Sequence, residues 1–317
     1  MKVDERQNIK CHYFTNGIDN QPGDQPIRVF YSNIESDFIN IKESLHQLRP
    51  NQNLANVKLE FLTENTKVIG PSTNGFKITL HDTFLSFLWG YIYSMIVTTP
   101  IGGKVVSSNE NKEARELRNH VHGLMTEYNF WNKEMLPNPE LFGKDENRLI
   151  GVSNSVFIIC VRYIIFHEFA HIFLGHTFIE SKLRTPENIQ KMEVDADNVA
   201  LDWTFQTLTK EDDFTGKLSL IFALNSISFS RNKFSNSISH PAPEDRITKY
   251  LERLKLKDSD LLWGFAIWSI IEWQTNHELF HLPVTYKSGD SYKKHFYEMV
   301  EELKELKNTG INKFKKS

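Results

Sequence analysis

The chain has 317 residues, of which 40% are hydrophobic and 24% charged, and this composition is that of a globular protein with a sizeable core. Its formal net charge of −3 argues against the strongly basic surface that nucleic-acid-binding proteins carry. The two cysteines, Cys11 and Cys160, lie far apart, which argues against a disulfide framework and against a thiolate zinc site.

The N-terminal segment, residues 1–26, is polar and is predicted to be irregular. Its first ten residues, MKVDERQNIK, lack the apolar stretch of a secretory signal. The longest apolar runs, at 84–97, 156–166 and 261–271, are shorter than the roughly 18 to 20 residues that span a bilayer. We therefore expect core helices and a cytoplasmic protein.

Strand signals fill the region from 27 to 80. Three segments have strand composition, IRVFYS (27–32), VKLEFL (57–62) and FKITL (76–80), and the last two alternate in polarity. The turn-forming residues GPSTNG (70–75) separate those two. The sequence therefore predicts a small antiparallel sheet in the N-terminal third.

Helical signals dominate after residue 80. We expect helices at about 82–98, 109–134, 153–174, 186–208, 215–229, 243–256, 260–279 and 291–307, with long loops at 137–148 and 228–243. Gly175 is placed to end the third helix, and Thr185-Pro186 to begin the fourth. The fold class is α+β and mainly helical, with a single domain over 27–317 that comprises a sheet part (27–80) and a helical body (81–317).

The third predicted helix contains HEFAH at 167–171, a match to the H-E-x-x-H pattern. His167 and His171 project about 40° apart on a helix, so that both imidazoles can bind one Zn²⁺. Glu168 is rotated by about 100°, which places its carboxylate beside the metal as a general base. The alternative is a surface helix with two chance histidines, but the apolar flanks VFIICVRYII and IFL indicate a buried helix, where His and Glu need partners.

A third metal ligand is predicted on the next helix. Glu193 and Asp197 share one helical face with the apolar residues Ile189, Met192, Ala196, Ala200 and Trp203. Glu193 can bind the metal, while Asp197 can accept the N–H of a ligand histidine and fix its tautomer. Asp195, on the opposite face, stays open as a rival ligand. His176 follows His171 by five residues and is interpreted as a helix-end residue.

Two further elements lie downstream. In SHPAPEDRI (239–247), His240 and Arg246 are candidates to stabilise a developing oxyanion, provided that a metal site exists nearby. A second H-E-x-x-H match, HELFH at 277–281, is followed by Pro283 and by no inward-facing carboxylate like Glu193. We therefore predict that the second match is not a metal site.

Together HEFAH, EVDAD (193–197) and SHPAPEDRI resemble the gluzincin-type zinc metallopeptidases, in the motif order of the membrane-embedded Ste24 and HtpX families. A soluble group, the phage-exclusion Lit peptidase family, resembles the chain better than these membrane-embedded families do, with the likeness concentrated between about 153 and 250. This resemblance implies a zincin-type body, one Zn²⁺ held by His167, His171 and Glu193, Glu168 as general base, Asp197 behind the ligands, and His240 and Arg246 on the oxyanion side.

The resemblance also implies a specific cellular role. It points to site-specific cleavage of a translation elongation factor, elongation factor Tu, in response to a phage-derived peptide or protein, with no nucleic-acid or membrane partner. Two alternatives remain at this stage. One is a general quality-control metallopeptidase, and the other is a non-catalytic regulator that uses a zincin-like core as a binding module.

Overall fold

The computed structural model describes residues 25–48, 54–99, 108–142, 148–208, 213–229, 241–276 and 291–309. The chain divides into two compact units, Met1–Ala223 and Leu224–Ser317, and each is described by itself. The architecture is α+β and mainly helical, which confirms the predicted fold class. The single domain predicted over 27–317 stays a prediction.

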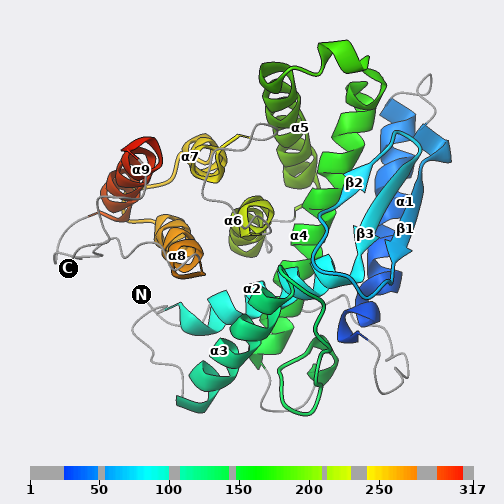
Figure 1. Ribbon diagram of the computed structural model, residues 1–317. Coiled ribbons are helices and arrows are strands. Elements are labelled where there is room, and N and C mark those ends of the chain that lie inside the picture. Colours follow the sequence, from blue (N-terminus) through cyan, green and yellow to red (C-terminus); the bar gives the residue numbers. More distant parts are fainter. Residues whose placement is uncertain are drawn as a thin grey trace. The chain divides into compact units, whose positions relative to one another are not determined.

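The first unit contains the sheet and most of the long helices (Figure 1). Its elements are η2 (Pro26–Phe30), α1 (Tyr31–Leu48), η3 (Leu54–Asn56), β1 (Lys58–Leu62), β2 (Ser72–Thr73), β3 (Lys77–His81), α2 (Asp82–Thr98), α3 (Ser108–Gly123), η4 (Pro139–Leu141), α4 (Arg148–Phe173), η5 (His176–Phe178), η6 (Ser181–Leu183), α5 (Pro186–Thr207) and the first part of α6 (Asp213–Phe229).

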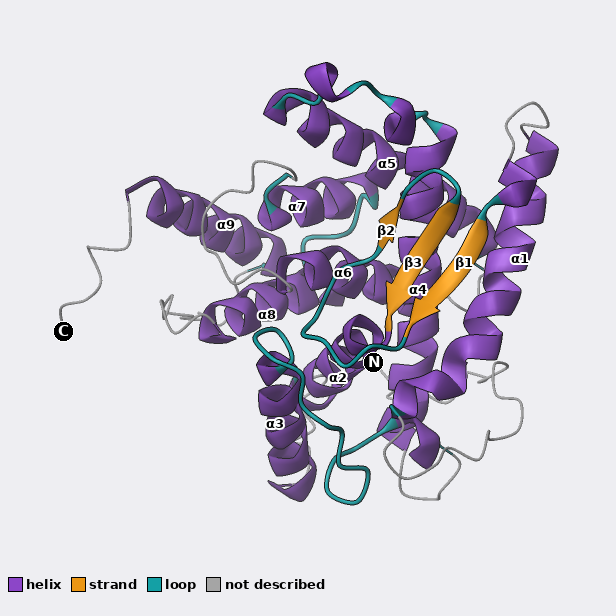
Figure 2. Ribbon diagram, turned by 45° about the vertical axis from the view of Figure 1, so that its right-hand side comes forward, coloured by secondary structure: helices purple, strands orange, loops and turns teal. Residues whose placement is uncertain are grey.

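The centre of this unit is α4, which packs against α1, α2, α5 and the sheet (Figure 2). Among the described helices, α4 alone has the length and composition to cross a membrane. Counting only unbroken apolar runs underestimated its length, because the helix starts before the run at 156–166. However, 89% of its most apolar window is buried inside the protein, as expected of a core helix.

The sheet is mixed, with the strand order β1-β3-β2. β2 and β3 form an antiparallel hairpin, but β1 pairs with β3 in parallel, from Lys58 opposite Lys77 to Leu62 opposite His81. The prediction of an antiparallel sheet is therefore wrong for one of the two pairings. Alternation of polarity reports which face of a strand is buried and carries no information about strand direction.

The segment 27–32 is helical, so its predicted strand is wrong. It forms η2 and the start of α1, and α1 buries Ile34, Phe38, Ile41 and Leu45 at helical spacing. Arg28 makes a salt bridge of 2.8 Å between its Nε and Asp82 Oδ2 at the start of α2. This pair fastens the N-terminal helices to the core.

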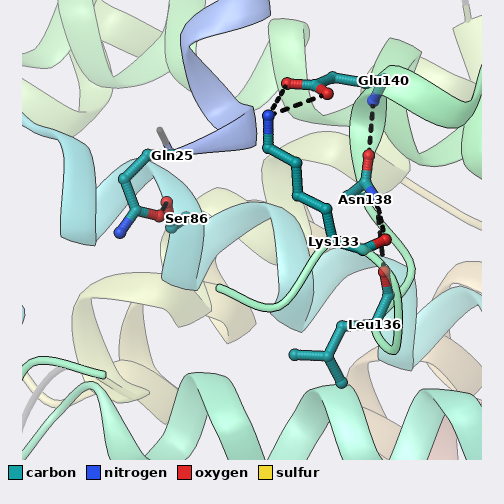
Figure 3. Close-up of polar contacts among 6 residues, drawn as sticks. All are labelled: Gln25, Ser86, Lys133, Leu136, Asn138 and Glu140. Atoms are coloured by element: carbon teal, nitrogen blue, oxygen red, sulfur yellow. Dashed lines mark hydrogen bonds and ion pairs between the residues drawn. The ribbon is translucent and has the colours of Figure 1, made fainter. Parts of the chain in front are cut away.

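The predicted helix 109–134 ends early, at Gly123, and an ordered irregular segment follows it. Buried Asn138 holds this segment together, since its Nδ2 donates to the carbonyls of Lys133 (3.2 Å) and Leu136 (3.3 Å) (Figure 3). Its Oδ1 accepts the backbone N–H of Glu140, whose carboxylate also binds Lys133 Nζ at 2.8 Å. Side-chain hydrogen bonds therefore replace helical ones here.

The second unit comprises the end of α6, α7 (Pro243–Arg253), α8 (Leu261–Asn276) and α9 (Tyr292–Thr309). α9 is fixed to the start of α7 by two ion pairs. Lys307 Nζ lies 2.5 Å from Glu244 Oε1 with both side chains buried, and Lys304 Nζ lies 3.0 Å from Asp245 Oδ1. The acidic first turn of α7 is thereby neutralised by α9.

Candidate metal centre

Two consecutive helices, α4 and α5, position the candidate site, and their ends are defined by the predicted caps. α4 ends at Phe173, and Gly175 follows with φ +76°, a left-handed conformation that glycine adopts without strain. α5 begins at Pro186, and the Thr185 side chain caps it by accepting the backbone N–H of Asn188. The short connection between these caps lets α4 and α5 pack side by side.

Three side chains converge where α4 faces α5. His167 Nε2 and His171 Nε2 lie 3.1 Å apart. Glu193 reaches both rings, with Oε2 at 3.4 Å from His167 Nε2 and Oε1 at 3.5 Å from His171 Nε2. One ligand atom from each residue lies within 4.8 Å of the other two. His167 and Glu193 are buried, and His171 is partly exposed.

These distances fit a metal ion. A tetrahedral zinc with bonds of about 2.0–2.1 Å to nitrogen and oxygen has its ligand atoms about 3.3 Å apart. The separations of 3.1, 3.4 and 3.5 Å in this cluster lie close to that value. Two imidazoles and one carboxylate also leave a fourth position open, as catalytic zinc sites require.

Asp197 fixes the orientation of the His167 ring. Its Oδ1 lies 3.0 Å from His167 Nδ1 and accepts the hydroxyl of Tyr163 at 2.8 Å. In the neutral ring, a proton on Nδ1, beside this carboxylate, leaves the Nε2 lone pair facing His171 and Glu193. The sequence analysis missed Tyr163. The available signal was its position four residues before His167, on the same stripe of a buried helix, where a hydroxyl needs a partner.

His176 supports the second imidazole. It lies in η5, directly after α4 as predicted, and its Nδ1 is 3.1 Å from His171 Nδ1. If the neutral His171 ring carries its proton on Nδ1, Nδ1 of His176 accepts a hydrogen bond from it. The Nε2 lone pair of His171 then faces the cluster. Each imidazole therefore has a partner on the ring nitrogen that points away from Glu193.

The electrostatics of the cluster differ from residue to residue. Burial lowers the pKa of His167, but hydrogen bonds and charge interactions with Asp197 and Glu193 outweigh it and raise this pKa to about 10. Burial and the neighbouring His167 charge lower the pKa of His171 to about 3. Burial raises the pKa of the Glu168 carboxyl to about 7, against the opposing charge of His167 and with a further increase from Glu193.

The rival carboxylate, Asp195, differs from Glu193 and Asp197 in burial, and which carboxylate binds a metal stays a prediction. Glu193 and Asp197 are buried, as the helical wheel predicted, whereas Asp195 is half-buried. Glu193 belongs to the metal-binding cluster of the described residues, and Asp195 does not. On α4, Arg162 makes a two-point contact with Asp37 of α1, at 2.9 and 3.2 Å, so this cation is neutralised by α1.

The placement of the remaining predicted residues relative to the cluster stays a prediction. Arg246 is buried on α7 in the second unit, and its role on the oxyanion side stays a prediction. His240 lies outside the described residues, as does the whole of HELFH at 277–281. The prediction that the second H-E-x-x-H match binds no metal is therefore not tested.

Taken together, these features define a mainly helical α+β protein in which two adjacent helices carry a buried cluster able to hold a metal ion. The family model described as Peptidase U49 matches residues 78–266, which include the whole of this cluster. The match covers more than half of the chain, so the chain belongs to the peptidase U49 family. No curated protein and no solved structure matches the chain.

Proposed function

We propose that this peptidase is a zinc-dependent endopeptidase, with His167, His171 and Glu193 as the metal ligands and Glu168 as the general base. The observation that carries the proposal is the convergence of two imidazoles and one carboxylate at tetrahedral-edge distances, in a chain whose family consists of peptidases. The resemblance to gluzincins supports the same ligand set, because it assigns the metal to the same three positions.

A zinc ion in this cluster would polarise the peptide carbonyl and lower the pKa of a water molecule. Glu168 takes the proton of the attacking water and delivers it to the leaving amine. In the metal-free protein, burial raises its pKa to about 7, and a nearby Zn²⁺ would lower this value towards the carboxylate form that accepts a proton. Asp197 keeps the His167 ring in the tautomer that leaves Nε2 available.

The oxyanion that forms during hydrolysis needs a positive or hydrogen-bonding partner. We assign this role to His240 and Arg246, on the basis of the SHPAPEDRI motif and its resemblance to the corresponding motif of gluzincins. Arg246 is buried on α7.

The substrate that we propose is one specific intracellular protein. The resemblance to the Lit family favours elongation factor Tu, cleaved in the cytoplasm after a phage-derived peptide or protein activates the enzyme. The order of the three motifs and the peptidase U49 match support this choice. Such cleavage would stop translation in an infected cell and limit phage growth.

The catalytic assignment is tested with a Glu168→Gln variant. We expect both this variant and the unmodified protein to bind one zinc per chain, and the variant to lose cleavage by at least about a hundredfold, the usual contribution of a general base. Metal analysis and cleavage assays are performed on the same preparations. Undiminished proteolysis by Glu168→Gln would refute the role of Glu168.

The location of the metal is tested by comparing His171→Ala with His281→Ala, each of which removes the second histidine of one H-E-x-x-H match. Zinc should be lost from the first variant and retained by the second. The reverse result would move the metal centre to the second match.

The substrate is identified by mass spectrometry of new protein termini in bacteria that express the active chain or Glu168→Gln, with and without phage infection. One dominant cut in elongation factor Tu, dependent on infection and on Glu168, supports the proposal. Broad cleavage of unfolded proteins would instead indicate a quality-control peptidase. The absence of any Glu168-dependent cut would indicate a non-catalytic regulator.

A further inference from the structure

Two large aromatic side chains are exposed together beside the end of α4. Phe76 and Phe178 are 64% and 62% exposed, and their rings meet edge-on with centroids 6.0 Å apart. They come from different elements, the β2–β3 turn and η5. The connection that carries Phe178 also exposes Leu174 and Leu183. Single exposed apolar residues are ordinary, but a paired set of this kind marks a binding surface.

The backbone of the β2–β3 turn brings Phe76 close to Phe178. Gly75 has φ +92°, and a Cβ at this position would lie 3.0 Å from both Phe178 Cζ and Thr177 Oγ1. The turn therefore approaches η5 more closely than a residue with a side chain would allow. Asn74 Oδ1 holds the turn by accepting the backbone N–H groups of Phe76 and Lys77, each at 3.0 Å. The position of Phe76 is therefore set by the turn.

Phe178 of this aromatic pair lies close to the candidate metal centre along the chain. Phe178 follows His176 by two residues in the single turn of η5, a backbone advance of roughly 4 Å. His176 in turn contacts the proposed ligand His171, with 3.1 Å between their Nδ1 atoms. Figure 2 shows the β2–β3 turn at the same end of the sheet as the connection from α4 to α5.

We propose that Phe76 and Phe178 form a docking surface for an apolar side chain of the peptide that this enzyme cleaves, close to the scissile bond. The inference rests on the proposed function, because it takes the metal centre as the place of cleavage. Two rings are far too few for the roughly 800 Å² that each partner contributes to a stable dimer, but they suit one side chain. A peptidase must bind a peptide beside its metal centre, whereas nothing requires a second copy of the chain or a membrane to bind there.

The test measures peptide binding without cleavage. The probes are synthetic peptides of one glycine- and serine-rich sequence that differ only in a central Phe, Leu, Ser or Asp. They are titrated against zinc-loaded, full-length Glu168→Gln. We expect central Phe or Leu to bind about tenfold more tightly than Ser, the gain expected from burying one apolar side chain. Adding Phe178→Ser or Phe76→Ser should bring this ratio close to one.

Phe130→Ser serves as the matched control. Phe130 is 49% exposed on the segment after α3, which contacts the start of α4 through the bond from Asn154 Nδ2 to the Pro139 carbonyl. His167 lies thirteen residues further along α4, about 20 Å away. Phe130→Ser should therefore leave the ratio unchanged. Because all three phenylalanines are exposed, their replacement should preserve the fold, which is checked by thermal unfolding.

Three results would overturn the docking surface: no peptide binding, equal binding of all central residues, or an apolar preference that survives Phe178→Ser. The zinc content of the same samples distinguishes a wrong docking surface from a wrong proposed function. Zinc binding without an apolar preference refutes the docking surface alone. An apolar preference that depends on Phe178 in a protein that binds no zinc refutes the proposed metal chemistry alone.

Discussion

At the scale of single residues, the candidate centre depends on the groups behind the proposed ligands as much as on the ligands. Asp197 lies beside Nδ1 of His167 and accepts the hydroxyl of Tyr163, and His176 lies beside Nδ1 of His171. The H-E-x-x-H pattern and the helical wheel of α5 predicted the three ligand positions and Asp197. The contacts of Tyr163 with Asp197 and of His176 with His171 were not predicted. The motif specifies the spacing of the ligands, but it does not specify which group contacts the ring nitrogen that does not bind the metal.

The first prediction concerns Asp197. We expect Asp197→Asn to weaken zinc binding about 10- to 100-fold, since loss of the carboxylate behind a ligand histidine has effects of this size. The affinity is measured by competition with a chelator. Asp195→Asn is the matched control on the same helix and should bind zinc normally. Equal losses in both variants would contradict the assignment of the two carboxylates.

The second prediction concerns protons. The pKa of about 10 means that His167 is protonated in the metal-free protein at pH 7.5, whereas the pKa of about 3 leaves His171 neutral. Zinc binds the neutral imidazole, so binding should release about one proton, and affinity should rise about tenfold per pH unit between pH 7 and 9. Calorimetry in buffers of different ionisation enthalpy counts the protons. Zinc binding that is independent of pH in this range would contradict the raised pKa of His167.

At the scale of elements, the sequence located most of the described long helices and the strands β1 and β3, but it did not predict α1 or the direction in which β1 pairs. The predicted helix 82–98 coincides with α2, and 186–208 differs from α5 by one residue. The first of these helices has a long apolar pattern, and the second has a clear N-terminal cap, Thr185. α1 was missed because its first turn overlaps the β-branched and aromatic run 27–32, although Ile34, Phe38, Ile41 and Leu45 keep helical spacing. The parallel pairing of β1 depends on contacts that no local pattern encodes.

The third prediction compares three glycines of the first unit that differ in backbone and surroundings. Gly70→Ala should change the free energy of unfolding by less than about 0.5 kcal/mol, because its Cβ would meet nothing within 4 Å. Gly175→Ala should cost about 1 kcal/mol for its positive φ. Gly75→Ala should cost more, because positive φ and the 3.0 Å contacts with η5 act together. Chemical denaturation measures the series, and a different order would show that the β2–β3 turn is not closely packed.

At the scale of the whole molecule, the family match, the fold and the cluster agree on a peptidase whose proposed ligands come from two adjacent helices of the first unit. A metal ion bound at this place would join α4 to α5 and would favour the folded chain over the unfolded one. The substrate could not be derived from the fold, because peptide specificity depends on surface side chains such as Phe76 and Phe178.

The fourth prediction follows from this linkage. Zinc at a hundredfold excess over its dissociation constant should stabilise the protein by about 2.7 kcal/mol. Its removal by a chelator should then lower the melting temperature by about 5 °C. Glu168→Gln should show the same shift, and His171→Ala should show none. A chelator effect that persists in His171→Ala would place the stabilising metal elsewhere.

The closeness of the cluster along the chain has a consequence for biosynthesis. Tyr163, His167, His171, Glu193 and Asp197 all fall within residues 163–197, on two helices joined by a short connection. Such local contacts form without closing a long loop. A growing chain that has passed residue 197 therefore already carries every proposed zinc ligand. The ion can be captured while the ribosome is still making the C-terminal third.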